Sequence, residues 1–349
     1  MNNNERTKLP KSLRVKSSRL RAKQDGLFFQ AVPSNSVVSL ALQSSANPQI
    51  VWPGRTVFTD KMKTSLSRCT KNFWYPNTDD ISLPRSHWVV NGLAEADRYP
   101  HALKYLAGQV EETGVAVFNS PQAVLDSRRD RSAQRLNGIV NLIVPQTRRF
   151  RPTHTDQFKQ VFASGGFEFP VLIRPAGTHT GKSLIKIDGP GDWDKIHVIP
   201  WGGTRVYMTQ WMDFRSSAGE WRKLRLSITP QAIRLRHILY GTDWLIHSVQ
   251  RSLDEVEREM EVLLNADDWE AMQQLGADIR DRVGLDFFGV DLGWKSDSEF
   301  VLFEANASMS ILSYHNMPES RRADYVGNLK KIEKDVWRSL EGVCKRTLV

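Results

Sequence analysis

The sequence has few cysteines and no long hydrophobic run. Only two cysteines, Cys69 and Cys344, occur among its 349 residues, which is too few for a disulfide framework and gives no metal-ligand spacing. No run of about 18 apolar residues exists, so a membrane-spanning helix is not expected. No apolar segment follows Met1 that would serve as a secretory signal. These absences indicate a globular protein of a reducing, cytoplasmic compartment without a membrane partner.

Basic residues are concentrated near the N-terminus. The chain has a formal net charge of +9, and residues 1–25 contain eight basic residues against Glu5 and Asp25, a net charge of +6. A basic segment with few apolar residues is typical of a disordered, solvated arm, which we assign to residues 1–30. Such an arm could also dock an acidic partner. The rest of the chain is not basic enough to indicate nucleic-acid binding.

Hydrophobic periodicity predicts alternating strands and helices after residue 85. Residues 88–93 and 115–118 are predicted strands, and residues 96–112 between them have a helical spacing that stops at Gly114. A strand, a helix and a strand in this order form a β-α-β unit with a parallel sheet. Residues 43–85, rich in proline, serine, asparagine and threonine, resist assignment.

The pattern after residue 120 predicts two α+β parts with antiparallel sheets. Helices are expected over residues 121–137, 155–163, 252–264, 268–283 and 319–340, and strands over residues 140–144, 169–175, 183–187 and 205–214. A further strand is expected in the N-terminal part, over residues 36–42. Residues 221–228 and 232–240 predict a hairpin. The predicted fold class is therefore α/β and α+β. Its parts are a Rossmann-like N-terminal domain over residues 31–120, a small subdomain over residues 121–205 and a C-terminal subdomain over residues 206–349.

Oxygen-bearing side chains interrupt two apolar, strand-like runs near the C-terminus. The polar residues 295–299 predict a hairpin turn, which would bring Asp291 roughly opposite Glu304. Glu304 and Asn306 are two residues apart, so in an extended chain they leave the same face. Buried carboxylates need a cation or hydrogen bonds, and hard oxygen ligands of this kind suit Mg²⁺. The alternative is a hairpin with a solvated acidic end.

Residues 177–183 (GTHTGKS) are similar to a phosphate-binding P-loop but do not match it. Ala176 stands where the pattern requires glycine, and the alternating residues 184–187 predict a strand, whereas a P-loop opens a helix. The two glycines still permit close backbone approach to phosphate, and the N–H groups can form an anion nest. The alternative is a plain tight hairpin.

Several cations are placed where an anion could bind. Arg174 closes the apolar strand 171–173, and a buried cation needs either phosphate or a structural carboxylate. Arg131 is the residue that we single out in the predicted helix 121–137, whose other arginines are expected to form a solvated face. Lys223 and Arg225 alternate along a strand and so share one face, which suits phosphate or a substrate carboxylate.

The order of these motifs resembles the ATP-grasp superfamily, which includes D-alanine–D-alanine ligases, glutathione synthetases and the ligases that add glutamate to a ribosomal protein. It is also similar, over roughly residues 80–310, to an ATP-grasp branch often fused to tetratricopeptide repeats in bacteria, although no such repeat is present here. The resemblance rests on residues 88–95, 117–121, 127–131, 145–150, 171–175, 177–183, 208–213, 222–225 and 303–306, and on His237, Trp244, His247 and Asp291.

This resemblance implies an ATP-grasp fold that clamps ATP between two subdomains, with Mg²⁺, expected as two ions. The implied activity is an ATP-dependent carboxylate–amine ligase that forms an acyl-phosphate and acts on an amino acid, a peptide or a protein tail. Asp291, Glu304 and Asn306 would bind the metal, and Arg225 and Arg174 would be catalytic. The nucleotide contacts would be Arg131, Arg174, Gly177, Thr178, Thr180, Gly181, Lys182, Ser183, Gln210, Trp211, Met212 and Asp213.

Other residues have less definite roles in this resemblance. Residues 308–310 could bind the acceptor carboxylate, and His237 and His247 are either structural or substrate contacts. Arg131 and Arg174 stand where the family usually has lysine, and Asp213 is the nearest acidic residue for the ribose. These departures leave open a degenerate nucleotide-binding or scaffold protein, and the fold also leaves open a kinase. The sequence does not identify the substrates or the oligomeric state, for which a dimer is one option.

Overall fold

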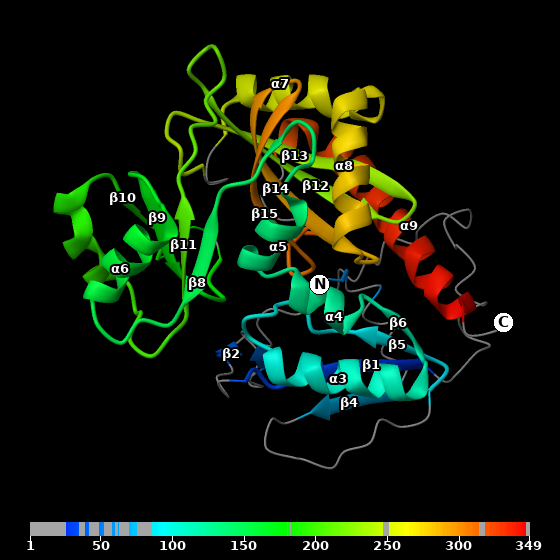
Figure 1. Ribbon diagram of the computed structural model, residues 1–349. Coiled ribbons are helices and arrows are strands. Elements are labelled where there is room, and N and C mark those ends of the chain that lie inside the picture. Colours follow the sequence, from blue (N-terminus) through cyan, green and yellow to red (C-terminus); the bar gives the residue numbers. More distant parts are fainter. Residues whose placement is uncertain are drawn as a thin grey trace, which may run out of the picture.

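The computed structural model describes residues 26–34, 39–41, 49–51, 58–59, 62, 70–74, 86–179, 181, 183–246, 251–313 and 318–346. These residues form three lobes, each built on its own sheet (Figure 1). The basic arm over residues 1–25, most of residues 43–85, and Cys69, Thr180, Lys182 and His247 lie outside the described residues. Within the described residues, no helix is long and apolar enough to cross a membrane.

The N-terminal lobe contains a parallel sheet in the order β4-β1-β5-β6. Strand β5 (Trp88–Asn91), helix α3 (Pro100–Thr113) and strand β6 (Ala116–Phe118) form the predicted β-α-β unit. The helix begins later than predicted, with proline in its first turn, and it ends at Gly114, whose φ of 65° places it in the left-handed region that favours glycine.

Strand β1 (Gly26–Ala31) corrects the assignment of residues 1–30 to a disordered arm. It lies in the middle of the parallel sheet, between β5 and β4 (Thr70–Trp74). Its sequence, GLFFQA, is buried along almost its whole length. The apolar run begins three residues after the last basic residue, Lys23, so the arm inferred from the composition of residues 1–25 was extended five residues too far.

The second lobe is a four-stranded antiparallel sheet in the order β10-β9-β11-β8, covered by α6 (Asp156–Gly165). Phe158, Val171, Ile173 and Met208 are fully buried in its core. The strand after residue 205 belongs to this sheet, so the lobe continues past the predicted boundary. The strands are β8 (Thr147–Phe150), β9 (Val171–Pro175), β10 (Ile185–Ile187) and β11 (Val206–Gln210).

The third lobe is a five-stranded sheet in the order β13-β12-β14-β15-β7. It contains both predicted hairpins, β12 with β13 and β14 with β15. Its short edge strand β7 pairs in parallel with β15, although residues 140–144 were assigned to the small subdomain. The strands are β7 (Leu142–Ile143), β12 (Trp221–Thr229), β13 (Ala232–Gly241), β14 (Phe288–Ser296) and β15 (Glu299–Asn306).

Helices cover this sheet and join it to the N-terminal lobe (Figure 1). Helix α7 (Leu253–Leu264) begins with a capping box in which Ser252 and Glu255 bond reciprocally, and α8 (Glu270–Val283) follows it. Helix α9 (Arg322–Arg346) packs against β12 and β13 of the third lobe and against β6 of the N-terminal lobe. The shared core under α9 therefore fixes these two lobes to one another. Apart from two helices within residues 121–136 that are described with the site, the remaining elements are β2 (Ser39–Ala41), β3 (Gln49–Val51), and the 3-10 helices at Pro190–Val198, Ala266–Asp268 and Glu319–Arg321.

Candidate functional site

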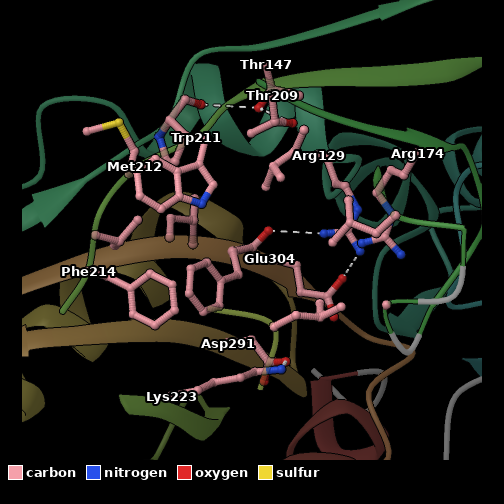
Figure 2. Close-up of a pocket in the computed structure, with 18 of the residues that line it drawn as sticks. Arg129, Thr147, Arg174, Thr209, Trp211, Met212, Phe214, Lys223, Asp291 and Glu304 are labelled. Atoms are coloured by element: carbon pink, nitrogen blue, oxygen red, sulfur yellow. Dashed lines mark hydrogen bonds and ion pairs between the residues drawn. The ribbon is translucent and has the colours of Figure 1, made fainter. Parts of the chain in front are cut away.

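A cavity of about 340 Å³ lies between the sheets of the second and third lobes. One part of its wall is apolar and the other part is charged (Figure 2). The apolar side chains include Trp211, Met212, Phe214, Trp244 and Phe303, and the charged ones include Arg129, Arg174, Lys223, Arg225, Asp291 and Glu304. The charged groups come from β9, β12, β14, β15 and the helix before β7, so the cavity exists only when the two lobes are assembled.

Asp291 and Glu304 are direct neighbours across the hairpin of β14 and β15, as the sequence predicted. Asp291 is buried and accepts a two-pronged ion pair from Arg225, with distances of 2.6 Å from Nε to Oδ1 and 2.8 Å from Nη2 to Oδ2. Lys223 adds a third contact of 2.7 Å from Nζ to Oδ2. Burial alone would raise the pKa of Asp291, but Arg225 and Lys223 hold it well below its usual range. Asp291 is therefore ionised at neutral pH.

Glu304 is held by Arg129 in the same way. Arg129 forms an ion pair with the carboxylate through Nη2, and its Nη1 donates to the backbone oxygen of Phe303 at 3.0 Å. Burial raises the pKa of Glu304, Arg129 lowers it, and the outcome is a pKa below the usual value despite the nearby Asp291. Two ionised carboxylates thus lie side by side, each neutralised by side chains of this chain.

Asn306 lies next to these carboxylates but lines a different hollow. Its Oδ1 accepts hydrogen bonds from the backbone N–H of Ser308 at 3.0 Å and from Ser308 Oγ at 2.9 Å. The hollow has a volume of about 20 Å³, the size of one water molecule, and it is also lined by Arg129 and Glu95. Metal binding by Asp291, Glu304 and Asn306 stays a prediction, but the three oxygen donors do lie on one hairpin.

Arg174 lies in the cavity close to Arg129 (Figure 2). Its guanidinium donates to the backbone oxygen and the hydroxyl of Thr178, and within the described residues it forms no ion pair with a carboxylate. Burial, followed by the repulsion of Arg129, lowers the pKa of Arg174 to about 9. The positive charge here is therefore incompletely compensated, which is the condition that favours binding of an anion.

The structure corrects the prediction that Arg131 is a nucleotide contact. Its side chain is 43% exposed and pairs with Asp126 on the outside of the helix, whereas Arg129 enters the cavity. The predicted single helix over residues 121–137 is in fact two: α4 (Pro121–Asp126) and α5 (Arg129–Leu136). Arg128 between them is extended, with ψ of 146°. The helix is therefore interrupted just before Arg129, the residue that pairs with Glu304.

Of the four residues 210–213 that were predicted to contact the nucleotide, three line the cavity. Trp211 and Met212 line the cavity, as does Gln210. The side chain of Gln210, however, is used in bonds to the backbone of Glu168 and Pro170. Asp213 does not line the cavity; it pairs with Arg215 at the surface. The expected ribose contact by Asp213 is therefore not supported, because a local ion pair turns its carboxylate away.

The loop at residues 177–183 joins two antiparallel strands, β9 and β10, as predicted, and no helix follows it. Gly177, Gly181 and Ser183 have φ values of 71°, 69° and 60°, so the backbone turns through the left-handed region. Thr178 closes the turn with a hydrogen bond from Oγ1 to the oxygen of Pro175, 2.7 Å. Gly181 lines the cavity, which places the loop over its charged end.

Sequence reasoning missed a set of contacts by which the N-terminal lobe holds this loop. Arg98 donates from Nε and Nη2 to the backbone oxygen of Gly177, at 3.1 and 2.6 Å. Glu95 pairs with His179 at 2.8 Å. Burial raises the pKa of Glu95, but His179 brings it below the usual value. The only available signal was the position of residues 95–98 directly after the buried strand β5, the usual place for functional loops in parallel sheets.

The candidate acceptor residues have different surroundings. Ser308 and Ser310 line the cavity, but His237 is opposite Arg225 in the sheet and does not line the cavity. Its Nε2 has no hydrogen-bond partner among the described residues. Burial and then Arg225 and Arg236 lower the pKa of His237 well below 6.5, so the imidazole is neutral. Whether it contacts a substrate stays a prediction.

No protein-family model and no curated protein sequence matches this chain. Among solved structures, it is similar to D-alanine–D-alanine ligase from Bacillus anthracis, with 11% identity, a TM-score of 0.48 and coverage of 93% of this chain and 99% of that chain. For VanG D-Ala:D-Ser ligase from Enterococcus faecalis these values are 12%, 0.48, 89% and 100%. For a RimK domain ATP-grasp protein from Sphaerobacter thermophilus they are 12%, 0.46, 89% and 99%.

The mixed α/β class that the sequence led us to expect is confirmed by the sheets and helices described above. The similar structures include proteins described as ATP-grasp, at TM-scores below 0.5. The closer resemblance to the branch fused to tetratricopeptide repeats stays a prediction.

Proposed function

We propose that this chain is an ATP-dependent ligase that joins a carboxylate to an amine through an acyl-phosphate. One observation carries the proposal: a single cavity has apolar, aromatic walls at one end and clustered cations with two ionised carboxylates at the other. A nucleotide has the same division, with an apolar base and a polyanionic tail. Pockets that combine apolar lining with a few convergent charged groups are the usual ligand sites of enzymes.

We infer the orientation of the nucleotide from the polarity of the cavity. Trp211, Met212 and Phe214 would contact the adenine, since they provide flat apolar surface. The triphosphate would extend toward Arg129 and Arg174, which can bind phosphate oxygens in a two-pronged manner. The loop at residues 177–183 would then cover the phosphates with its backbone N–H groups.

Oxygen donors that fit Mg²⁺ lie at the same end. Asp291 and Glu304 are ionised and adjacent in the cavity. Asn306, two residues beyond Glu304 on the same hairpin, would add an amide oxygen from the neighbouring hollow, and such a donor set suits this hard cation. These residues would hold the metal, which when bound neutralises phosphate charge. Two ions are our expectation from the resemblance.

The chemistry that the chain must support is positioning and charge neutralisation. The substrate carboxylate attacks the γ-phosphorus of ATP, ADP leaves, and an amine then displaces phosphate from the acyl-phosphate. Arg225 and Lys223 face the cavity beside Asp291 and would offset the negative charge of the carboxylate and the acyl-phosphate. Ser308 and Ser310 line the same cavity and would bind the acceptor. We expect an amino acid, a peptide or a protein tail as substrate.

The proposal is tested by nucleotide binding and by ADP release. Mg-ATP at about 100 times its dissociation constant should stabilise the fold by about 2.7 kcal/mol, seen as a shift in thermal unfolding. ADP release should then appear with one pair from a panel of carboxylates and amines, and disappear in Glu304→Gln. The matched control is Glu299→Gln, which changes a carboxylate in the turn of the same hairpin, where Glu299 pairs with Lys295.

Two outcomes would overturn it. No stabilisation by saturating nucleotide would leave a degenerate nucleotide-binding or scaffold protein. ADP release that yields a stable phosphorylated alcohol or sugar, with no amine required, would make the protein a kinase.

A further inference from the structure

We propose that Arg129 makes metal binding at Glu304 depend on an anion: the guanidinium occupies the carboxylate until a polyphosphate draws it away. The inference rests on the proposed function, because it concerns the order in which nucleotide and divalent cation enter the same cavity. It assigns to Arg129 a positioning role that the motif at residues 127–131 did not indicate.

The first observation is the pair itself. Arg129 binds the Glu304 carboxylate and also the backbone oxygen of Phe303, and the two side chains are only 18% and 15% exposed. A guanidinium held by two acceptors out of solvent uses the same carboxylate that a metal ion would need. A divalent cation must therefore compete with an intramolecular partner that is already in place.

The second observation is the charge balance of the cavity. Among the described residues, four cations (Arg129, Arg174, Lys223 and Arg225) line the cavity with two carboxylates, Asp291 and Glu304. Asp291 already has two cationic partners, and the nearby Glu95 is paired with His179. Adding a divalent cation to a cluster with excess positive charge is opposed by Coulomb repulsion, which is strong in a site of low dielectric. Without an anion, the cavity as built disfavours the metal.

The third observation shows what would reverse this preference. Arg174 lies near enough to Arg129 for each to repel the other, and Arg174 forms no ion pair with a carboxylate within the described residues. Phosphate oxygens between the two guanidinium groups would relieve that repulsion and give Arg129 a new partner. Glu304 would then be released to the metal, so that no buried charge is left without a partner.

The test measures Mn²⁺ binding to the full chain by the electron paramagnetic resonance signal of free Mn²⁺. Titrations are run without nucleotide and with a non-hydrolysable ATP analogue, and a protein-free titration corrects for Mn²⁺ bound by the analogue. The variants are Arg129→Gln and Arg129→Met, with Arg129→Gln/Glu304→Gln as the double variant. Arg135→Gln is the control, because Arg135 lies on the same helix and pairs with Asp126, outside the cavity.

In the wild type we expect Mn²⁺ affinity to rise at least tenfold with the analogue. Arg129→Gln and Arg129→Met should show that gain without any nucleotide, the double variant should lose it, and Arg135→Gln should behave as wild type. If the wild type binds the analogue but both Arg129 variants keep wild-type Mn²⁺ affinity, the role of Arg129 is overturned and the proposed function stands.

Two further results would also decide the matter. A wild type that fails to bind the analogue in a separate calorimetric titration overturns the proposed function and, with it, the anion dependence. If neither Arg129 variant folds, the wild type alone is decisive, since equal Mn²⁺ affinity with and without bound analogue overturns the inference.

Discussion

Replacing Arg174 by methionine should stabilise the free protein while it weakens nucleotide binding. Arg174 lies in the cavity beside Arg129, without a carboxylate in ion-pair contact among the described residues. Methionine fills a similar length of the pocket and carries no charge. The two effects have opposite signs, so they separate a ligand-binding arginine from a structural one.

The size of the stabilisation follows from the pKa. The pKa of Arg174 falls from the ordinary 12.5 to about 9. At about 1.4 kcal/mol for each pKa unit, the folded state destabilises the charged side chain by about 5 kcal/mol. The whole cost is present at pH 7, because that pH lies below both values. Partial solvent contact reduces it by more than half, and the bonds lost to Thr178 offset about 1 kcal/mol more. A net gain of about 1 kcal/mol remains.

The assay combines two measurements on one pair of proteins. Urea unfolding, followed by tryptophan fluorescence, gives the change in stability, and calorimetric titration with Mg-ATP gives the change in affinity. The loss of affinity should be about 1.5–3 kcal/mol, the range for hydrogen bonds to charged groups. Arg322→Met is the control, since Arg322 is an exposed arginine on α9 that pairs with Glu319; it should change neither quantity.

A less stable Arg174→Met variant with unchanged ATP affinity would refute this reasoning. It would mean that the bonds to Thr178 outweigh the charge repulsion, and that Arg174 is a structural residue that holds the loop at residues 177–183.

Three further predictions concern the surroundings of the cavity. Asp291→Asn should lower the free energy of unfolding by about 3–5 kcal/mol, because it leaves two cations without their counter-charge; urea titration checks this, and a loss below 1 kcal/mol would contradict it. His237 has a folded pKa below its unfolded value of about 6.5, so wild type should lose up to about 1.4 kcal/mol per pH unit below 6.5. His237→Gln should lose less between pH 7.5 and 5.5. Arg98→Met should speed amide hydrogen exchange at residues 177–179, since it removes the bonds to Gly177, and unchanged exchange would assign the order of that segment to Thr178.

The sequence was sufficient for the features that depend on local periodicity. The β-α-β unit, the two hairpins and the placement of Asp291 opposite Glu304 all follow from alternation and turn residues, since a hairpin with a short polar turn leaves little freedom in register. The same kind of local pattern was sufficient to reject a P-loop, because the residues after the loop form strand β10 and not a helix.

Features that depend on helix phase or on long-range partners were not predictable. Arg131 was preferred to Arg129 because it follows Asp130, where the resembling family usually has lysine, and nothing in residues 121–137 marks the extended Arg128. Asp213 was chosen by its position after Met212, but Arg215 two residues later holds it at the surface. Both errors concern which way a charged side chain points, and ion pairs with nearby residues decide that direction.

The contacts of residues 95–98 make the N-terminal lobe part of the site. Asp97 accepts a hydrogen bond of 2.6 Å from the hydroxyl of Tyr207 and pairs with Arg149, both in the second lobe. Burial, and then Glu95, raises the pKa of Asp97, so these partners are what keep a buried carboxylate acceptable there.

Helix α9 fixes the N-terminal lobe to the third lobe through a buried core. The contacts of residues 95–98 with the second lobe, in contrast, are ion pairs and hydrogen bonds. If the cavity opens to admit nucleotide, the second lobe should therefore move relative to the other two. Because Glu95 and Arg98 contact the loop at residues 177–183, that movement would change the contacts that hold the loop.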